Sequence, residues 1–87
     1  MINIKILSYK SPQRYAIKQT ILAARNALSK TQPDLDISVT EVKNLAEMEE
    51  YTNVVIYPSL VINEKLVCIG RFPKKEEVIG WLQQAME

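Results

Sequence analysis

Apolar and polar residues alternate over two stretches of the chain, which predicts two strands. Ile2, Ile4 and Ile6 alternate with polar residues in one strand, residues 2–7, and Leu35, Ile37 and Val39 do so in the other, near residues 35–42. A period of two suits a strand with at least one buried face. Two further apolar runs, 60–62 and 66–69, flank Asn63-Glu64 and predict a hairpin, although its turn has no glycine.

A helical spacing of apolar residues follows the first predicted strand. It predicts a helix over residues 12–29, whose apolar stripe is Ile17, Ile21, Ala24 and Leu28. Pro12 suits the first turn, where its missing N–H has no partner, and Ser11 before it is expected to be the N-cap.

Two more helices are predicted in the second half of the chain. Asn44 with Glu47 resembles a capping box and predicts a short helix that ends at Thr52-Asn53. A last helix follows Pro73 and carries an apolar stripe that includes Val78 and Leu82.

The predicted order is therefore β-α-β-α-β-β-α. The first strand, helix and strand form a right-handed parallel unit, whereas the final hairpin is antiparallel. We expect an α/β protein with a four-stranded mixed sheet and helices on both faces, because strands that are apolar on both sides need cover on each.

Length and charge limit the function classes. Eighty-seven residues predict a single domain over residues 1–87, and a net charge of +1 argues against nucleic acid or a membrane as the main partner. The chain has no apolar run long enough to cross a bilayer, and residues 1–5 do not resemble a signal peptide. We expect a cytoplasmic protein.

Cysteine and histidine usage restricts the chemistry further. Cys68 is the only cysteine, which excludes an internal disulfide, and the chain has no histidine, which removes a zinc cluster and the usual general base. Neither a metal nor another cofactor is predicted. The apolar neighbours of Cys68 predict a buried, inert thiol.

Two proline motifs carry a resemblance to a known family. Ser11-Pro12-Gln13-Arg14 follows the first strand, and Ile56-Tyr57-Pro58-Ser59 precedes the third. Together they resemble the active site of the thioredoxin/glutaredoxin-like superfamily, and the chain looks most like the small archaeal and bacterial redox-active disulfide proteins. The first site reads Cys-x-x-Cys in that family, and the second is a cis-proline that faces it. The resemblance covers nearly the whole chain and implies a thioredoxin-like fold.

Ser11 and Arg14 stand where the two thiols of this family would be. Disulfide oxidoreductase activity is therefore not expected, because a serine hydroxyl does not ionise there without a base. Ser11 is either a plain helix cap or a donor to a bound thiolate. Arg14 is either a solvated surface cation or, with Lys10, part of an anion site at the helix N-terminus.

The resemblance implies a binding role for Tyr57-Pro58. In the family, the residue before the cis-proline offers its backbone to an extended peptide or to glutathione, which pairs like an added strand. Tyr57 would do so here. The alternative is that Pro58 only shapes the loop beside the first helix.

These residues support two functions of different classes. The first is a redox-inactive thioredoxin-like module that binds a protein or extended peptide in the groove beside Pro58. The second is a protein or transferase-like enzyme that binds glutathione or a small thiol through Ser11 at the helix N-terminus. A third possibility is a domain that only supplies packing surface in a larger assembly.

Overall fold

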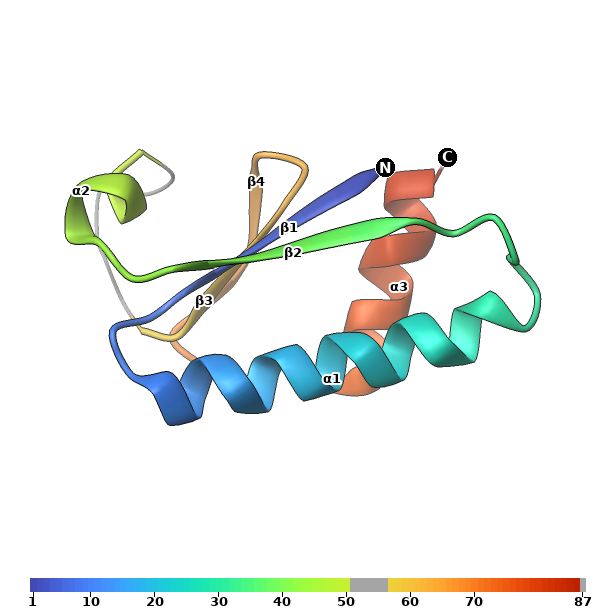
Figure 1. Ribbon diagram of the computed structural model, residues 1–87, viewed down its shortest axis with the longest axis horizontal. Helices are drawn as coiled ribbons and strands as arrows, with labels where there is room; N and C mark the ends of the chain where they lie inside the picture. Colours follow the sequence, from blue (N-terminus) through green and yellow to red (C-terminus); the bar gives the residue numbers. More distant parts are fainter. Residues whose placement is uncertain (51–56, 87) are drawn as a thin grey trace.

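A computed structural model describes residues 1–50 and 57–86 of the chain. The expected order β-α-β-α-β-β-α is confirmed. The elements are β1 (Ile2–Leu7), α1 (Ser11–Ser29), β2 (Ile37–Val42), α2 (Leu45–Met48), β3 (Ser59–Ile62), β4 (Lys65–Ile69) and α3 (Lys75–Met86). Figure 1 shows their arrangement.

The strands form one mixed sheet in the order β2-β1-β3-β4. β1 pairs in parallel with β2, from Ile2 opposite Ile37 to Leu7 opposite Val42. β3 pairs antiparallel with both β1 and β4. The parallel unit and the antiparallel hairpin that the sequence predicts are both present.

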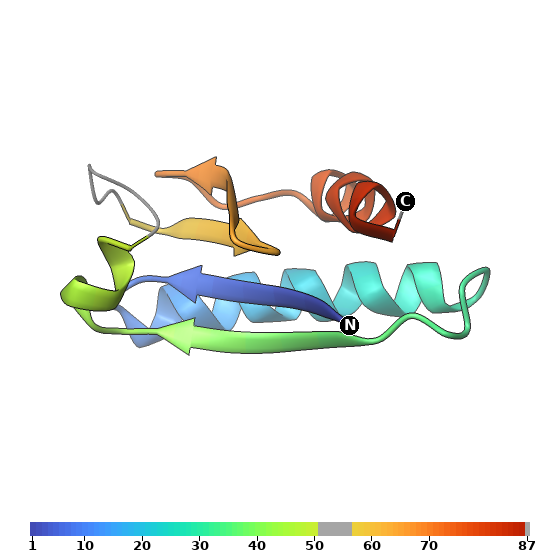
Figure 2. The same ribbon diagram turned by 90° about the horizontal axis from the view of Figure 1, so that it is seen from above.

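The main core lies between the sheet and the two long helices. α1 and α3 lie on the same side of the sheet, and α3 crosses α1 steeply (Figures 1 and 2). All four residues of the apolar stripe predicted for α1 are buried in this core. From the sheet it takes the even-numbered residues Ile2, Ile4, Ile6, Leu60, Ile62 and Cys68.

The opposite face of the sheet carries a smaller core. Leu7, Val42 and Val61 pack there with Met48, which α2 contributes. Helical cover on both faces is therefore present as expected, but it is unequal, because α2 spans only four residues. Asn44 caps α2 by accepting a hydrogen bond from the Ala46 N–H at 2.8 Å.

The turn of the β3–β4 hairpin has an unusual backbone. Asn63 and Glu64 have φ angles of 49° and 68°, the left-handed region that a type I′ turn requires at both central residues. Asn63 adopts this region readily, and its side-chain oxygen accepts the Asn3 N–H at 2.9 Å. Glu64 does not favour the left-handed region. The turn therefore holds a strained residue at the position where glycine usually stands.

One predicted boundary differs in the structure, and another lies outside the described residues. The second strand begins at Ile37 and not at residue 35, because the Leu35 N–H donates to the Gln32 carbonyl at 3.0 Å and so belongs to the preceding turn. The predicted end of the short helix at Thr52-Asn53 lies outside the described residues, as does Ile56 of the second proline motif. Within residues 1–50 and 57–86, no helix is both long and apolar enough to cross a membrane.

Candidate binding site

Three loops come together at one end of the sheet. They are residues 8–12 between β1 and α1, residues 57–59 at the start of β3, and residues 69–73 after β4; we call them the loop cluster. Both views place them at the same end of the molecule (Figures 1 and 2). The Gly70 N–H donates to the Pro58 carbonyl at 2.8 Å, which joins the second loop to the third.

Ser8 organises the first of these loops. It is fully buried, and its hydroxyl accepts the Lys10 N–H at 3.1 Å and donates to Gln13 Oε1 at 2.5 Å. Its own N–H donates to the Val42 carbonyl at 3.2 Å. Ser8 is not among the site residues that the sequence predicts. Its place between a strand and a helix that begins with proline was the available signal, because short polar side chains there bond to nearby backbone.

Ser11 is the first residue of α1 and not its N-cap, so that prediction was wrong. Lys10 is the N-cap, and its carbonyl accepts the Arg14 N–H at 3.1 Å. Because Ser8 holds the Lys10 N–H, the helix begins one residue earlier than expected. The Ser11 side chain is exposed and makes no hydrogen bond within the described residues.

Arg14 is buried, and its interpretation as a solvated surface cation was wrong. Its residue is 7% exposed. Nε donates to Glu41 Oε1 at 2.9 Å, and Nη1 donates to the Ser8 carbonyl at 2.9 Å. Glu41 pairs with Ile6 in the β1–β2 ladder and so lies on the face that α1 covers. The chain thus supplies its own anion beside Arg14, and the geometry does not favour an anion site shared with Lys10.

Tyr57 and Tyr9 form an aromatic pair between the first two loops. Their ring centroids are 4.7 Å apart with an interplanar angle of 50°. Burial raises the pKa of Tyr57 to about 12, with further contributions from a side-chain hydrogen bond to Tyr9 and from the nearby charge of Glu49. The Tyr57–Pro58 peptide bond is cis in the structure.

The third loop is fastened to α3 by an ion pair. Arg71 donates from Nη1 and Nη2 to the two carboxylate oxygens of Glu77, at 2.7 and 2.6 Å. Glu77 also accepts the Lys74 N–H at 3.0 Å, at the start of α3. The hydrogen bonds from Arg71 are the main reason that the pKa of the Glu77 carboxyl falls to about 2.

Cys68 is buried, as predicted. It is 3% exposed, and its thiol donates to the Arg71 carbonyl at 3.3 Å. Burial raises the pKa of the thiol, so the reactive thiolate is disfavoured. Cys68 pairs with Leu60 in the ladder and lies on the face of the sheet that α1 and α3 cover, so its thiol reaches the third loop only from the core side. No cluster of potential metal ligands occurs in residues 1–50 and 57–86.

The loop cluster exposes large apolar side chains. Tyr9, in the first loop, is 52% exposed. Ile69 and Phe72, in the third loop, are 50% and 51% exposed. The half-buried Tyr57 contacts Tyr9 and also packs against the smaller core of Leu7, Val42, Met48 and Val61. Solvent-exposed aromatic side chains gathered on ordered loops are typical of a surface that contacts another molecule.

Comparison with known proteins gives one match. A family model described as a thioredoxin domain matches residues 2–83, which is nearly the whole chain. Neither a curated protein nor a solved structure shows significant similarity to the chain.

Proposed function

Because the chain belongs to the thioredoxin domain family, we propose that its loop cluster binds an extended segment of a partner protein without dithiol–disulfide exchange. The observation that supports this proposal is the exposure of three large apolar side chains, Tyr9, Ile69 and Phe72, on the loops that adjoin Pro58. The Gly70–Pro58 hydrogen bond and the Tyr9–Tyr57 pair connect the three loops that carry them.

The backbone at Tyr57 supports an extended ligand. The first residue pair of the β3–β4 ladder is Ser59 with Ile69, so Tyr57 lies outside that ladder. A peptide that runs past Pro58 could exchange main-chain hydrogen bonds with Tyr57 and place alternate side chains against the aromatic residues.

Internal hydrogen bonds brace two of the loops. Ser8 and Arg14 hold the first loop from within, and Arg71 with Glu77 holds the third. Binding to such a surface costs less conformational entropy than binding to loops that must first become ordered. The contacts of a disulfide are thus not needed to shape this site.

The redox part of the proposal follows from the thiol inventory. A dithiol–disulfide cycle requires two thiols within one molecule, and the chain has one, Cys68. That thiol is buried, and it donates to the Arg71 carbonyl beneath the third loop. We expect insulin reduction by this protein, with a suitable electron donor, to equal that of a Cys68→Ala variant. Turnover above that level contradicts the proposal.

A small thiol is the second candidate ligand. The exposed Ser11 hydroxyl, which no cap bond occupies, favours it, because this group lies on the loop cluster at the N-terminus of α1. Glutathione would then hold its thiol near Ser11 and its backbone beside Tyr57.

The test is a binding experiment with selected peptides. Peptides from a random display library are selected on the immobilised protein, and the tightest one is titrated into ¹⁵N-labelled protein. We expect amide shift changes at the loop cluster and a loss of affinity of about tenfold in Tyr9→Ala, which removes one aromatic contact. Tyr15→Ala is the matched control, because Tyr15 is also exposed but lies on α1.

Three outcomes are informative. Shift changes that avoid the loop cluster, or equal affinity of Tyr9→Ala and Tyr15→Ala, contradict peptide binding at this surface. Saturable shift changes with glutathione that disappear in Ser11→Ala favour the second candidate. The absence of such changes at millimolar glutathione removes that candidate.

A further inference from the structure

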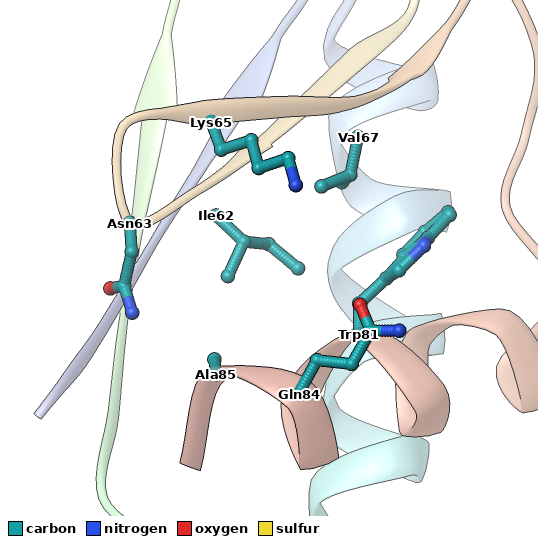
Figure 3. A pocket seen from close by; sticks show the side chains of 7 residues that line it. All are labelled: Ile62, Asn63, Lys65, Val67, Trp81, Gln84 and Ala85. Atoms are coloured by element: carbon teal, nitrogen blue, oxygen red, sulfur yellow. The ribbon is translucent and has the colours of Figure 1, made fainter. Parts of the chain in front are cut away.

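A pocket lies at the opposite end of the sheet from the loop cluster. It is formed between the tip of the β3–β4 hairpin and the second half of α3, and its volume is about 200 Å³ (Figure 3). No residue of the loop cluster lines it. An inference about this pocket therefore stands independently of the proposed function.

The walls of the pocket are largely apolar. Ile62 and Val67 line it from the hairpin, and Trp81 and Ala85 line it from α3 (Figure 3). The Trp81 ring is half-buried, so part of the indole remains open to solvent. An indole beside aliphatic side chains provides a surface on which a flat, apolar ring packs well.

The polar groups of the pocket are mostly hydrogen-bond donors. Lys65 extends over Ile62 toward Val67 and carries its ammonium on the Trp81 side (Figure 3). Within residues 1–50 and 57–86, that ammonium has no ion-pair or hydrogen-bond partner. The nearest acid in sequence, Glu64, instead pairs with Lys5 at 3.5 Å.

Asn63 contributes a second donor of known orientation. Its side-chain oxygen is occupied by the Asn3 N–H, so the amide NH₂ is the group that remains available. The indole N–H of Trp81 can only donate, and Gln84 adds an amide that can donate or accept. One unpaired cation and several donors therefore surround an apolar floor.

We propose that this pocket binds a small aromatic carboxylate. The ring packs on Trp81 against Val67 and Ile62, and the carboxylate accepts from the Lys65 ammonium, which lies on the same side of Ile62 as Trp81 (Figure 3). A single negative charge matches the single ammonium, whereas a dianionic phosphate would carry one uncompensated charge beside apolar walls. The volume is below the roughly 300–1,000 Å³ of pockets for drug-sized ligands, which limits the ligand to about one ring.

Trp81 makes the proposal directly measurable. It is the only tryptophan in the chain, so tryptophan fluorescence reports on this pocket alone. We expect benzoate to change the fluorescence saturably at millimolar concentration. Benzamide has the same shape without the charge and acetate has the charge without the ring, and we expect both to bind at least about tenfold more weakly.

Two variants identify the residues involved. Lys65→Gln keeps the length of the side chain and should weaken benzoate about tenfold, while Lys75→Gln, at the other end of α3, should leave affinity unchanged. The amide spectrum of each variant shows that it remains folded. In Trp81→Phe, binding is followed by amide shifts at Lys65 and Asn63, and we expect weaker binding because the ring is smaller.

The proposal is overturned by any of three results. These are the absence of a saturable response to benzoate, equal affinity for benzoate and benzamide, and equal affinity of Lys65→Gln and the wild type. Peptide binding at the loop cluster can succeed or fail in each case, since the two sites share no residue.

Discussion

Arg14 Nε donates to Glu41 Oε1 at 2.9 Å, and this pair joins the first turn of α1 to the end of β2. The same guanidinium donates to the Ser8 carbonyl, which closes the loop between β1 and α1. Arg14 is therefore a structural cation. It shapes the loop cluster from beneath.

Replacement of Arg14 should destabilise the protein. Arg14→Ala leaves the Ser8 carbonyl and the partly exposed Glu41 carboxylate without this donor, and hydrogen bonds to charged groups contribute about 1.5–3 kcal/mol each. We expect the free energy of unfolding to fall by about 1–3 kcal/mol, since Glu41 recovers some hydration. Denaturant unfolding measures this change.

Two further variants test the geometry of this cation. Arg14→Lys should not restore stability, because an ammonium lacks the planar fork that reaches both acceptors. Glu41→Gln should cost less than Arg14→Ala, since an amide oxygen still accepts from Nε. A stability of Arg14→Ala within about 0.5 kcal/mol of the wild type, the usual range for a surface substitution, contradicts the assigned role.

The hairpin turn offers a stabilising substitution. Glu64 has φ 68°, which lies in the left-handed region. This backbone conformation costs a residue with a side chain about 1–2 kcal/mol of conformational free energy. Glu64→Gly should raise the free energy of unfolding by up to about 1 kcal/mol, because part of the gain is lost to the flexibility of glycine in the unfolded chain. The Lys5–Glu64 pair that it removes is exposed and weak.

Glu64→Ala is the matched control for that turn. It removes the same carboxylate and keeps the side-chain strain, so it should show no gain in thermal or denaturant unfolding. If alanine stabilises the protein as much as glycine does, the charge and not the backbone is responsible.

The Tyr57 hydroxyl should lose its proton at a higher pH than an ordinary tyrosine does. Its pKa is raised from 10.0 to about 12, so the folded state favours the neutral phenol. The corresponding stability is complete below pH 10 and is lost as the pH rises from 10 toward 12. A titration followed by phenolate absorbance should show a step near pH 12 in the wild type.

Tyr9→Phe should lower the pKa of Tyr57, because it removes a hydrogen bond that favours the neutral form. Tyr57→Phe should remove the late absorbance step altogether. A wild-type titration without a step near pH 12 would falsify the burial of the Tyr57 hydroxyl against Tyr9.

Glu77 should make the protein sensitive to acid. Its pKa is lowered from 4.5 to about 2, so the folded state favours the carboxylate. This stability is present above pH 4.5 and is lost as the pH falls from 4.5 toward 2. Unfolding measured across this range should show a smaller dependence on pH in Glu77→Gln than in the wild type.

Glu76→Gln provides the comparison for Glu77. Glu76 also lies in the first turn of α3 but is exposed and has no ion pair within the described residues. Equal pH dependence in the two variants would mean that Arg71 does not hold the loop to α3 in solution.

The elements and their order could be predicted from the sequence because each depends on local patterns. Period two in residues 2–7 and helical spacing in residues 12–29 indicate β1 and α1 without reference to residues distant in sequence. The two proline motifs indicated the thioredoxin-like family, and the family match over residues 2–83 confirms it. The burial of Cys68 followed from its apolar neighbours.

The sequence by itself thus determined the strands, the helices, the mixed sheet and the loss of the thiol pair. Only the tertiary structure decided what Arg14, Ser8 and Lys65 do. Arg14 is buried because β2 brings Glu41 beneath α1, across 27 residues of sequence, and no local pattern encodes that meeting. Lys65 lines a pocket because α3 places Trp81 beside the hairpin, so the environment of a side chain depends on partners that only folding brings together.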